Sequence, residues 1–203
     1  MKVLLIGGSS NIGKSTVAAA LAARLGWKHA STDLLARHPG RPWPKGETPV
    51  PPHVANHYLG LANDDLLASV LDHYARLWPA IEQLVRGHVG GQTGERMVIE
   101  GSALWPATVA DLGLAGVGAI WLTGSDALFR ARIRSESRYA ETDRHGRRLI
   151  DVFLERTLRY NRAMMAEVLS LKLPFIKVGS ATRVEDLAQQ CLSDAVLLCG
   201  RGL

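Results

Sequence analysis

The stretch GGSSNIGKST at residues 7–16 combines glycines, small polar residues and one lysine in a spacing suited to phosphate binding. From Gly8 to Ser15 it matches the pattern G-x-x-x-x-G-K-[ST] without a mismatch. Glycines let successive backbone N–H groups surround an anion, and the N-terminus of a following helix adds partial positive charge. Lys14 would reach the β- and γ-phosphates of a nucleotide, and the Ser15 hydroxyl would be a ligand for Mg²⁺. We therefore expect Mg-ATP to be bound by Gly8, Ser9, Ser10, Asn11, Ile12, Gly13, Lys14, Ser15 and Thr16.

Two carboxylates stand where predicted strands end. Asp33 follows a predicted strand at residues 27–31, and Glu100 closes the apolar run that begins at Met97. Phosphoryl transfer depends mainly on positioning, with a carboxylate that orients the attacking hydroxyl and accepts its proton. Asp33 could instead cap a following helix, and Glu100 could hold a metal-bound water or pin the turn at Gly101. The sequence leaves open which carboxylate is the base.

Arginines gather in one segment of the chain. Arg130, Arg134 and Arg138 follow at spacings of four, which predicts one shared face on a helix from residue 126 to about 138. Like charges at this spacing repel unless an anion such as phosphate lies between them. The alternative is a solvated basic face, paired with Glu136, Glu141 and Asp143. Arg132 lies nearby, and Arg144, Arg147 and Arg148 follow.

A proline-rich stretch follows Asp33. Residues 39–52 contain six of the nine prolines, which predicts a long loop. Arg41 could bind a carboxylate or phosphate there and Trp43 could wall a pocket, or the stretch could be a rigid surface loop. The pair His53 and His57 lacks the glutamate of a metal-binding helix, so we expect no metal site there.

Alternating strands and helices have to position these residues. Apolar runs predict strands at residues 2–7, 27–31, 97–101, 117–124 and 173–179. Helical periodicity predicts helices at residues 15–25, from a cap at Asn63 or Asp64 to 89, from 126 to about 138 and at 150–171. A capping box from Thr182 to Glu185 opens a last helix, and residues 142–148 form a polar break. The alternation predicts an α/β fold with a parallel sheet, whose ligands bind beyond the carboxyl ends of the strands.

Composition narrows the class of protein. The length of 203 residues fits one core-forming domain, and the absence of an apolar run of membrane length favours a cytoplasmic protein. Residues 130–162 hold ten arginines, no lysine and five acids, and so carry the whole net charge of +5. Arginine without lysine favours binding of discrete phosphates or carboxylates, so a nucleic-acid partner is not expected. A membrane partner is not expected either, because no apolar run reaches the length of a membrane span. Cys191 and Cys199 are expected to be buried free thiols.

The phosphate loop, the Asp after the second strand, the IEG of the third strand and the arginine-rich segment together resemble the P-loop small-molecule kinases. Shikimate kinase, gluconate kinase, chloramphenicol phosphotransferase and 2-phosphoglycerate kinase belong to this group. The resemblance implies a P-loop NTPase fold, with five parallel strands in the order 2-3-1-4-5 flanked by helices. It implies one domain at residues 1–203, with a substrate-binding insert at 34–90 and an arginine-rich lid at 130–150.

The resemblance also implies roles for single residues. Asp33 would contact the hydroxyl of the substrate. Lid closure would bring Arg130 onto the nucleotide and Arg134 into catalysis beside Lys14. The turn at residues 179–182 would border the adenine.

The expected activity is transfer of the γ-phosphate of Mg-ATP to a hydroxyl of a small molecule. The alternative is a P-loop protein that binds ATP as a regulatory switch or as a nucleic-acid-linked ATPase. The proline-rich insert separates the two, because a substrate pocket needs such a wall and a switch does not. Neither the acceptor nor the oligomeric state is specified by the sequence.

Overall fold

The computed structural model describes residues 1–35, 38–44, 46, 48–91 and 94–198. The strands are β1 (Val3–Gly8), β2 (Lys28–Ser31), β3 (Met97–Glu100), β4 (Val117–Gly124), β5 (Phe175–Val178) and β6 (Val196–Leu197). The helices are α1 (Lys14–Leu25), α2 (Pro52–Gly60), α3 (Asn63–Gly90), α4 (Pro106–Ala110), α5 (Asp126–Glu136), α6 (Arg144–Ser170) and α7 (Val184–Asp194), with 3₁₀ turns η1 (Thr32–Leu34) and η2 (Tyr139–Glu141). Cys191 is a buried free thiol as predicted, whereas Cys199 lies outside the described residues.

Five parallel strands form a sheet in the order β2-β3-β1-β4-β5, which confirms the predicted fold and strand order. The two-residue strand β6, which the sequence did not predict, pairs antiparallel with β4. In register, Glu100 of β3 lies opposite both Ile6 of β1 and Ser31 of β2. The carboxyl ends of these three strands therefore meet at one edge of the sheet, where parallel sheets bind ligands.

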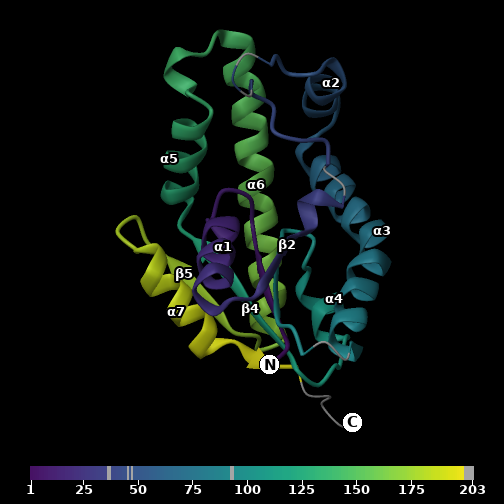
Figure 1. Cartoon of the computed structure of the whole chain (residues 1–203). Helices are drawn as coiled ribbons and strands as arrows, with labels where there is room; N and C mark the ends of the chain where they lie inside the picture. Colours follow the sequence, from purple (N-terminus) through teal and green to yellow (C-terminus); the bar gives the residue numbers. More distant parts are fainter. Residues whose placement is uncertain (36–37, 45, 47, 92–93, 199–203) are drawn as a thin grey trace.

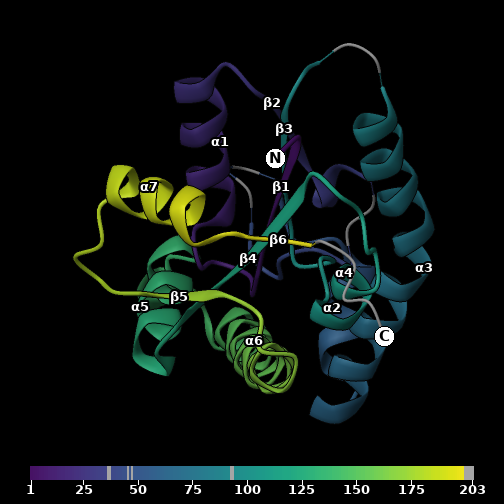
Figure 2. The same ribbon diagram turned by 90° about the horizontal axis from the view of Figure 1, so that it is seen from below.

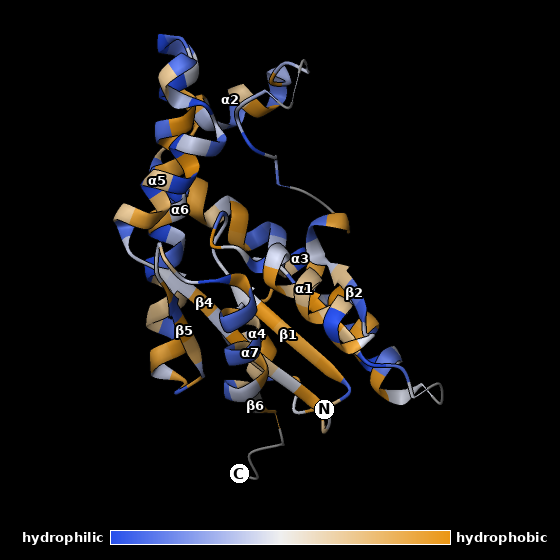
Figure 3. Ribbon diagram, turned by 60° about the vertical axis from the view of Figure 1, so that its left-hand side comes forward, coloured by the Kyte–Doolittle hydropathy of each residue, from blue (hydrophilic) through white to orange (hydrophobic). Residues whose placement is uncertain are grey.

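Helices cover both faces of the sheet (Figures 1 and 2). α1 packs with α7 on one face, while α3 and α4 lie with α6 on the other. Leu4 and Ile6 of β1 belong to the first core, and Val3 and Leu5 to the second, because successive side chains of a strand point to opposite faces. β1 is therefore buried along its whole length, and most of it is coloured as hydrophobic in Figure 3. None of the described helices combines the length and apolar character needed to cross a membrane.

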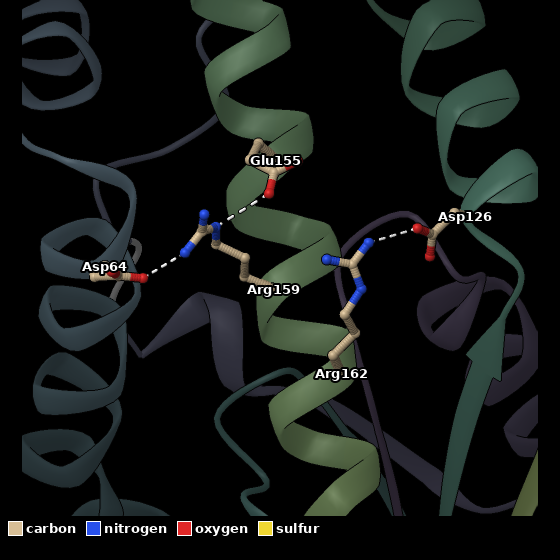
Figure 4. A network of polar contacts seen from close by, with 5 residues as sticks. All are labelled: Asp64, Asp126, Glu155, Arg159 and Arg162. Carbon is tan, nitrogen blue, oxygen red and sulfur yellow. Dashed lines mark hydrogen bonds and ion pairs between the residues drawn. The ribbon is translucent and has the colours of Figure 1, made fainter.

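Helix α6 is tied to its neighbours on two sides by ion pairs (Figure 4). Arg159 pairs with Asp64 of α3 and, with 3.0 Å between Nε and Oε1, with Glu155 one turn earlier. Arg162 Nη2 lies 2.6 Å from Asp126 Oδ2 at the start of α5. Exposed pairs of this kind contribute about 0–1 kcal/mol each, so they orient the helix more than they stabilise it. Part of the positive charge of residues 130–162 is thus paired with acidic side chains of the protein itself.

The predicted polar break at residues 142–148 is wrong, because α6 begins at Arg144. Asp143 is the N-cap of this helix, and its Oδ1 accepts a hydrogen bond of 2.7 Å from the backbone N–H of Gly146. A side-chain cap of this kind satisfies a backbone donor that has no partner within the helix. The polar residues of the stretch therefore form the first turns of a 27-residue helix.

The predicted face of three arginines is also wrong in part. α5 ends at Glu136, and Arg138 adopts a positive φ of 52° just beyond it. Arg130 and Arg134 remain on α5, but Arg138 lies outside the helix and pairs with Glu141, 2.5 Å away.

The other differences concern caps and short helices. α3 begins after Ala62 without a side-chain cap, so neither Asn63 nor Asp64 caps it. The predicted capping box is wrong, because α7 begins after Arg183 and the Thr182 hydroxyl instead accepts a hydrogen bond of 2.9 Å from the backbone of Gly179. Helices α2 and α4, which the sequence did not predict, each begin with proline in the first turn, where its missing N–H costs nothing.

Candidate active site

The phosphate loop joins the central strand β1 to helix α1, in the position the sequence predicts. Gly8 has a φ of 142°, and a Cβ atom there would lie 2.6 Å from the backbone oxygen of Leu122 in β4. Gly13 has a φ of 102° and is the N-cap of α1. Only glycine meets both requirements at low cost, so the sheet and the helix together fix the path of the loop.

Lys14 lies across the inside of this loop. Its side chain is buried, and Nζ donates hydrogen bonds to the backbone oxygen of Ser9 at 2.8 Å and to Ser102 Oγ at 3.2 Å. Burial lowers the pKa of Lys14, the nearby charges of Glu100 and Asp33 raise it, and Arg41 lowers it. A cation in these surroundings is ready to exchange its backbone partner for a phosphate oxygen.

Glu100 stands beside the hydroxyl that the sequence assigns to the metal. Ser15 Oγ donates a hydrogen bond of 3.0 Å to Glu100 Oε1, and the Glu100 side chain is 2% exposed. A hydroxyl and a carboxylate oxygen side by side are the ligand types that Mg²⁺ takes next to nucleotide phosphates, so these residues fit the ion. Among the described residues, no group of three or more His, Cys, Asp and Glu side chains is arranged to hold a metal.

Asp33 lies in η1, just beyond the end of β2. The cap of this turn is Ser31, whose Oγ accepts a hydrogen bond of 3.4 Å from the backbone N–H of Asp33, so Asp33 itself is no helix cap. Its carboxylate is exposed and acts on the pKa of Lys14, which places it at the mouth of the loop. Close packing of β2 and β3 fixes this position, since a Cβ on Gly101 would lie 1.7 Å from Thr32 Oγ1.

Arg132 is the arginine of α5 that touches the phosphate loop. Its Nη1 donates to the backbone oxygen of Ile12 at 2.7 Å and to that of Asn11 at 3.3 Å. The predicted Arg134 instead lies over the ring of Tyr139 at 4.7 Å and 3.8 Å from Asp151, and Arg130 is exposed. The spacing of four that singled out Arg130 and Arg134 excluded Arg132, which lies on another face of the helix.

The later arginines of the predicted lid lie away from the phosphate loop. Arg147 donates to the backbone oxygens of Tyr139 and Ala140 at 3.1 and 2.8 Å. It lines an open groove of about 690 Å³ with the residues Asn63, Tyr139, Thr142, Asp143, Arg144, Arg148, Asp151, Val152 and Glu155. Arg156 is not among the residues that line this groove.

Arg156 was missed by the sequence analysis, although it lies on the apolar face of α6. It is 5% exposed and lies 5.3 Å from the ring centroid of Tyr58 and 4.8 Å from that of Phe153. Its Nη1 has no hydrogen-bond partner, and none of the described carboxylates forms an ion pair with it. Beside it lies a small cavity that reaches Ser9 and Ser10 of the phosphate loop. Its place among apolar positions at spacings of three and four was the signal that could have revealed it.

The proline-rich stretch and α2 pack onto α6 next to this arginine. Trp43 is 9% exposed and contacts Phe153 edge to face, with 4.9 Å between the ring centroids. Tyr58 OH donates a hydrogen bond of 2.8 Å to the backbone oxygen of Gly40. The stretch is therefore anchored at two points around Arg41, as a wall of a pocket requires.

Three histidines join the parts of this insert. His38, after β2, lies 4.8 Å from His57 of α2 and 4.9 Å from His73 of α3, measured between ring centroids. His38 Nε2 lies 3.0 Å from Ser69 Oγ of α3. Burial, with His57, His73 and Arg156 nearby, lowers the pKa of His38 to about 4. The His38 imidazole at the centre of these ring contacts is therefore neutral at pH 7.

Neither a scan against protein-family models nor a search of curated proteins found a match. Among solved structures, a sugar kinase from Janibacter sp. HTCC2649 is similar with a TM-score of 0.57 and 18% identity, over 95% of this chain and 93% of that one. Shikimate kinase from Bacteroides thetaiotaomicron has a TM-score of 0.51 and 14% identity, over 94% of this chain and 96% of that one. Deoxyadenosine kinase from M. mycoides, bound to dATP, has a TM-score of 0.50 and 14% identity, over 94% and 97%. At this identity the likeness concerns the fold, and the chain has the fold of the P-loop small-molecule kinases.

Proposed function

We propose that this protein is an ATP-dependent phosphotransferase, which moves the γ-phosphoryl group of Mg-ATP to a hydroxyl of a small anionic molecule. The observation that carries the proposal is the joint placement of Lys14, Ser15 and Glu100 at the end of β1 and β3. These residues supply a cation for the phosphates and two oxygen ligands for a metal, on the fold that small-molecule kinases share.

The two carboxylates take different roles in this proposal. Glu100 is buried against Ser15, so it belongs with the metal, and bound Mg²⁺ would neutralise phosphate charge there. Asp33 is exposed at the mouth of the loop, where it can orient the acceptor hydroxyl and accept its proton. In this proposal the insert at residues 34–90 binds the acceptor, and the lid at residues 130–150 covers the nucleotide.

The acceptor carries a carboxylate or a phosphate in this proposal, because Arg156 is a buried cation with an unpartnered donor. A buried charge is costly unless it is paired, and the planar guanidinium fork matches carboxylate and phosphate groups. The guanidinium packs against the rings of Tyr58 and Phe153, and these contacts restrict its orientation.

The test is a screen for ATP consumption with a library of hydroxy acids and sugar phosphates, with Lys14→Ala as the blank. We expect one class of anionic alcohol to stimulate turnover. Asp33→Asn should keep its affinity for Mg-ATP and lose turnover about 100-fold or more, since a positioned base contributes about 10²–10⁴. Glu100→Gln should raise the Mg²⁺ concentration needed for half-maximal binding of ATP.

Two results would contradict the proposed phosphotransfer or the proposed roles of the carboxylates. Full turnover in Asp33→Asn and Glu100→Gln together would remove the proposed roles. Hydrolysis of ATP that no acceptor stimulates, but that RNA or DNA does, would support the alternative of a nucleic-acid-linked ATPase. The ion pairs of Arg138, Arg159 and Arg162 with acids of the protein itself disfavour that alternative.

A further inference from the structure

The anchored stretch around Arg41 places a cation beside the phosphate loop. Gly40 on one side is held by the hydroxyl of Tyr58, and Trp43 on the other side is buried against Phe153. Between these two fixed points, Arg41 has little freedom in its backbone position. The guanidinium itself is half-exposed, with 5.8 Å from its Cζ to the ring centroid of Trp43, so the end of the side chain can move.

One carboxylate joins this arginine to the phosphate loop. Glu136, the last residue of α5, accepts a hydrogen bond from Arg41 Nη1 on Oε1 and another from Asn11 Nδ2 on Oε2. Asn11 is a residue of the loop itself, with a left-handed φ of 63°. Arg41 therefore lies at the mouth of the loop, where its charge also lowers the pKa of Lys14.

Several arginines of the predicted lid have other partners. Arg134 lies over Tyr139 and near Asp151, and Arg147 binds the backbone of η2. Arg132 donates to backbone oxygens of the loop, so it supports the loop rather than a phosphate. Among the described arginines of the insert (34–90) and of the predicted lid (130–150), Arg41 is the one whose partner is a side chain that binds the loop.

We propose that Arg41, carried by the insert rather than by the lid, is the catalytic arginine that stabilises the transferring phosphoryl group. This inference rests on the proposed phosphotransfer. In that step the bond between the γ-phosphorus and the β–γ bridging oxygen breaks, and a bond to the acceptor oxygen forms. The acceptor proton passes to Asp33, and ADP leaves with the electron pair. Arg41 neither gains nor loses a proton in this step. It exchanges its ion pair with Glu136 for hydrogen bonds to the oxygens of the γ-phosphate, which carries more negative charge.

The experiment uses water as the acceptor, so it needs no identified substrate. Single-turnover hydrolysis of Mg-ATP and the Kd of Mg-ATP are measured for the wild type, Arg41→Ala, Arg41→Lys and Arg134→Ala. Arg76→Ala is the matched control, because Arg76 forms an exposed pair with Asp72 on α3. The affinity for Mg-ADP with and without aluminium fluoride gives a second readout of transition-state binding.

We expect Arg41→Ala to slow hydrolysis about 100-fold or more, while the Kd of Mg-ATP changes about threefold or less. The gain in affinity that aluminium fluoride gives to Mg-ADP should disappear as well. Arg41→Lys should restore part of the rate, because it keeps the charge without the fork. Arg134→Ala and Arg76→Ala should behave as the wild type.

Two results would overturn the inference, and they are distinguishable. If Arg134→Ala loses the rate and the aluminium fluoride effect while Arg41→Ala keeps both, the lid supplies the arginine and the phosphotransfer itself stands. If the wild type binds no Mg-ATP at all, the proposed function fails and takes this inference with it.

Discussion

Gly101 shows how a single hydrogen atom in place of a side chain sets the geometry of the site. It follows Glu100 directly, and its position allows Thr32 to pack against the end of β3. Asp33, which follows Thr32, is thereby held at the same edge of the sheet as Glu100, the proposed metal ligand. The distance between the proposed base and the proposed metal ligand thus depends on a residue that does no chemistry.

Gly101→Ala should therefore destabilise the protein and impair the site together. The added Cβ would lie 1.7 Å from Thr32 Oγ1, so the strand ends must separate, at a cost of about 1–3 kcal/mol. Urea unfolding of the variant measures this cost. Gly87→Ala is the control, because a Cβ there has open space inside α3 and should stabilise the helix by about 0.5–1 kcal/mol. Equal stability of the two variants would contradict the packing argument.

Among the elements, the insert shows best what the sequence could predict and what it could not. Six prolines predicted a loop after β2 correctly, and Arg41 and Trp43 were identified there as candidates for a pocket. Helix α2 was missed, because its apolar residues contact α6, nearly a hundred positions later in the chain. Arg156 was missed for the same reason, since a cation among apolar positions becomes informative only when the packing around it is known.

The histidine contact among the segments of the insert should make stability depend on pH. His38 has a folded-state pKa of about 4 against an ordinary value of 6.5, so the fold favours its neutral form. Its contribution is complete above about pH 6.5 and is lost as the pH falls towards 4. Burial and Arg156 lower the pKa of His57 as well, in the same direction.

The midpoint of urea unfolding should fall between pH 7 and pH 5 in the wild type. It should fall less in His38→Gln, which has no imidazole to protonate at the centre of the contact. His53→Gln is the matched control, since this exposed residue makes none of the ring contacts found in the insert. A steeper pH dependence in His38→Gln than in the wild type would contradict the prediction.

At the scale of the whole molecule, the fold followed from local patterns, because the five parallel strands were predicted from apolar runs and most of the helices from their periodicity. Strand order came with the recognised phosphate loop, which fixes β1 at the centre of the sheet. The start of α6 could not be predicted in this way, because Asp143 and the polar residues after it are typical of a turn. Only the structure shows that Asp143 caps the helix. The contacts of single arginines also required the structure, since ten of them lie within one short segment.

Arg156→Met should make the whole protein more stable and inactive. The variant loses contacts with two aromatic rings, worth about 0.5–2 kcal/mol, but it avoids several kcal/mol of desolvation of a lone buried charge. We expect a higher urea midpoint than the wild type and no acceptor-stimulated turnover. A lower midpoint would show that the guanidinium has a structural role.

In the proposed function the acceptor anion pairs with the buried guanidinium of Arg156, so the supply of that acceptor would also affect the lifetime of the protein. An anion that binds the native protein and not its denatured form adds about 2.7 kcal/mol at a concentration of 100 times its Kd. Cellular proteases remove chains in proportion to the fraction that opens. Scarcity of the acceptor would then lower the abundance of the protein, without any transcriptional control.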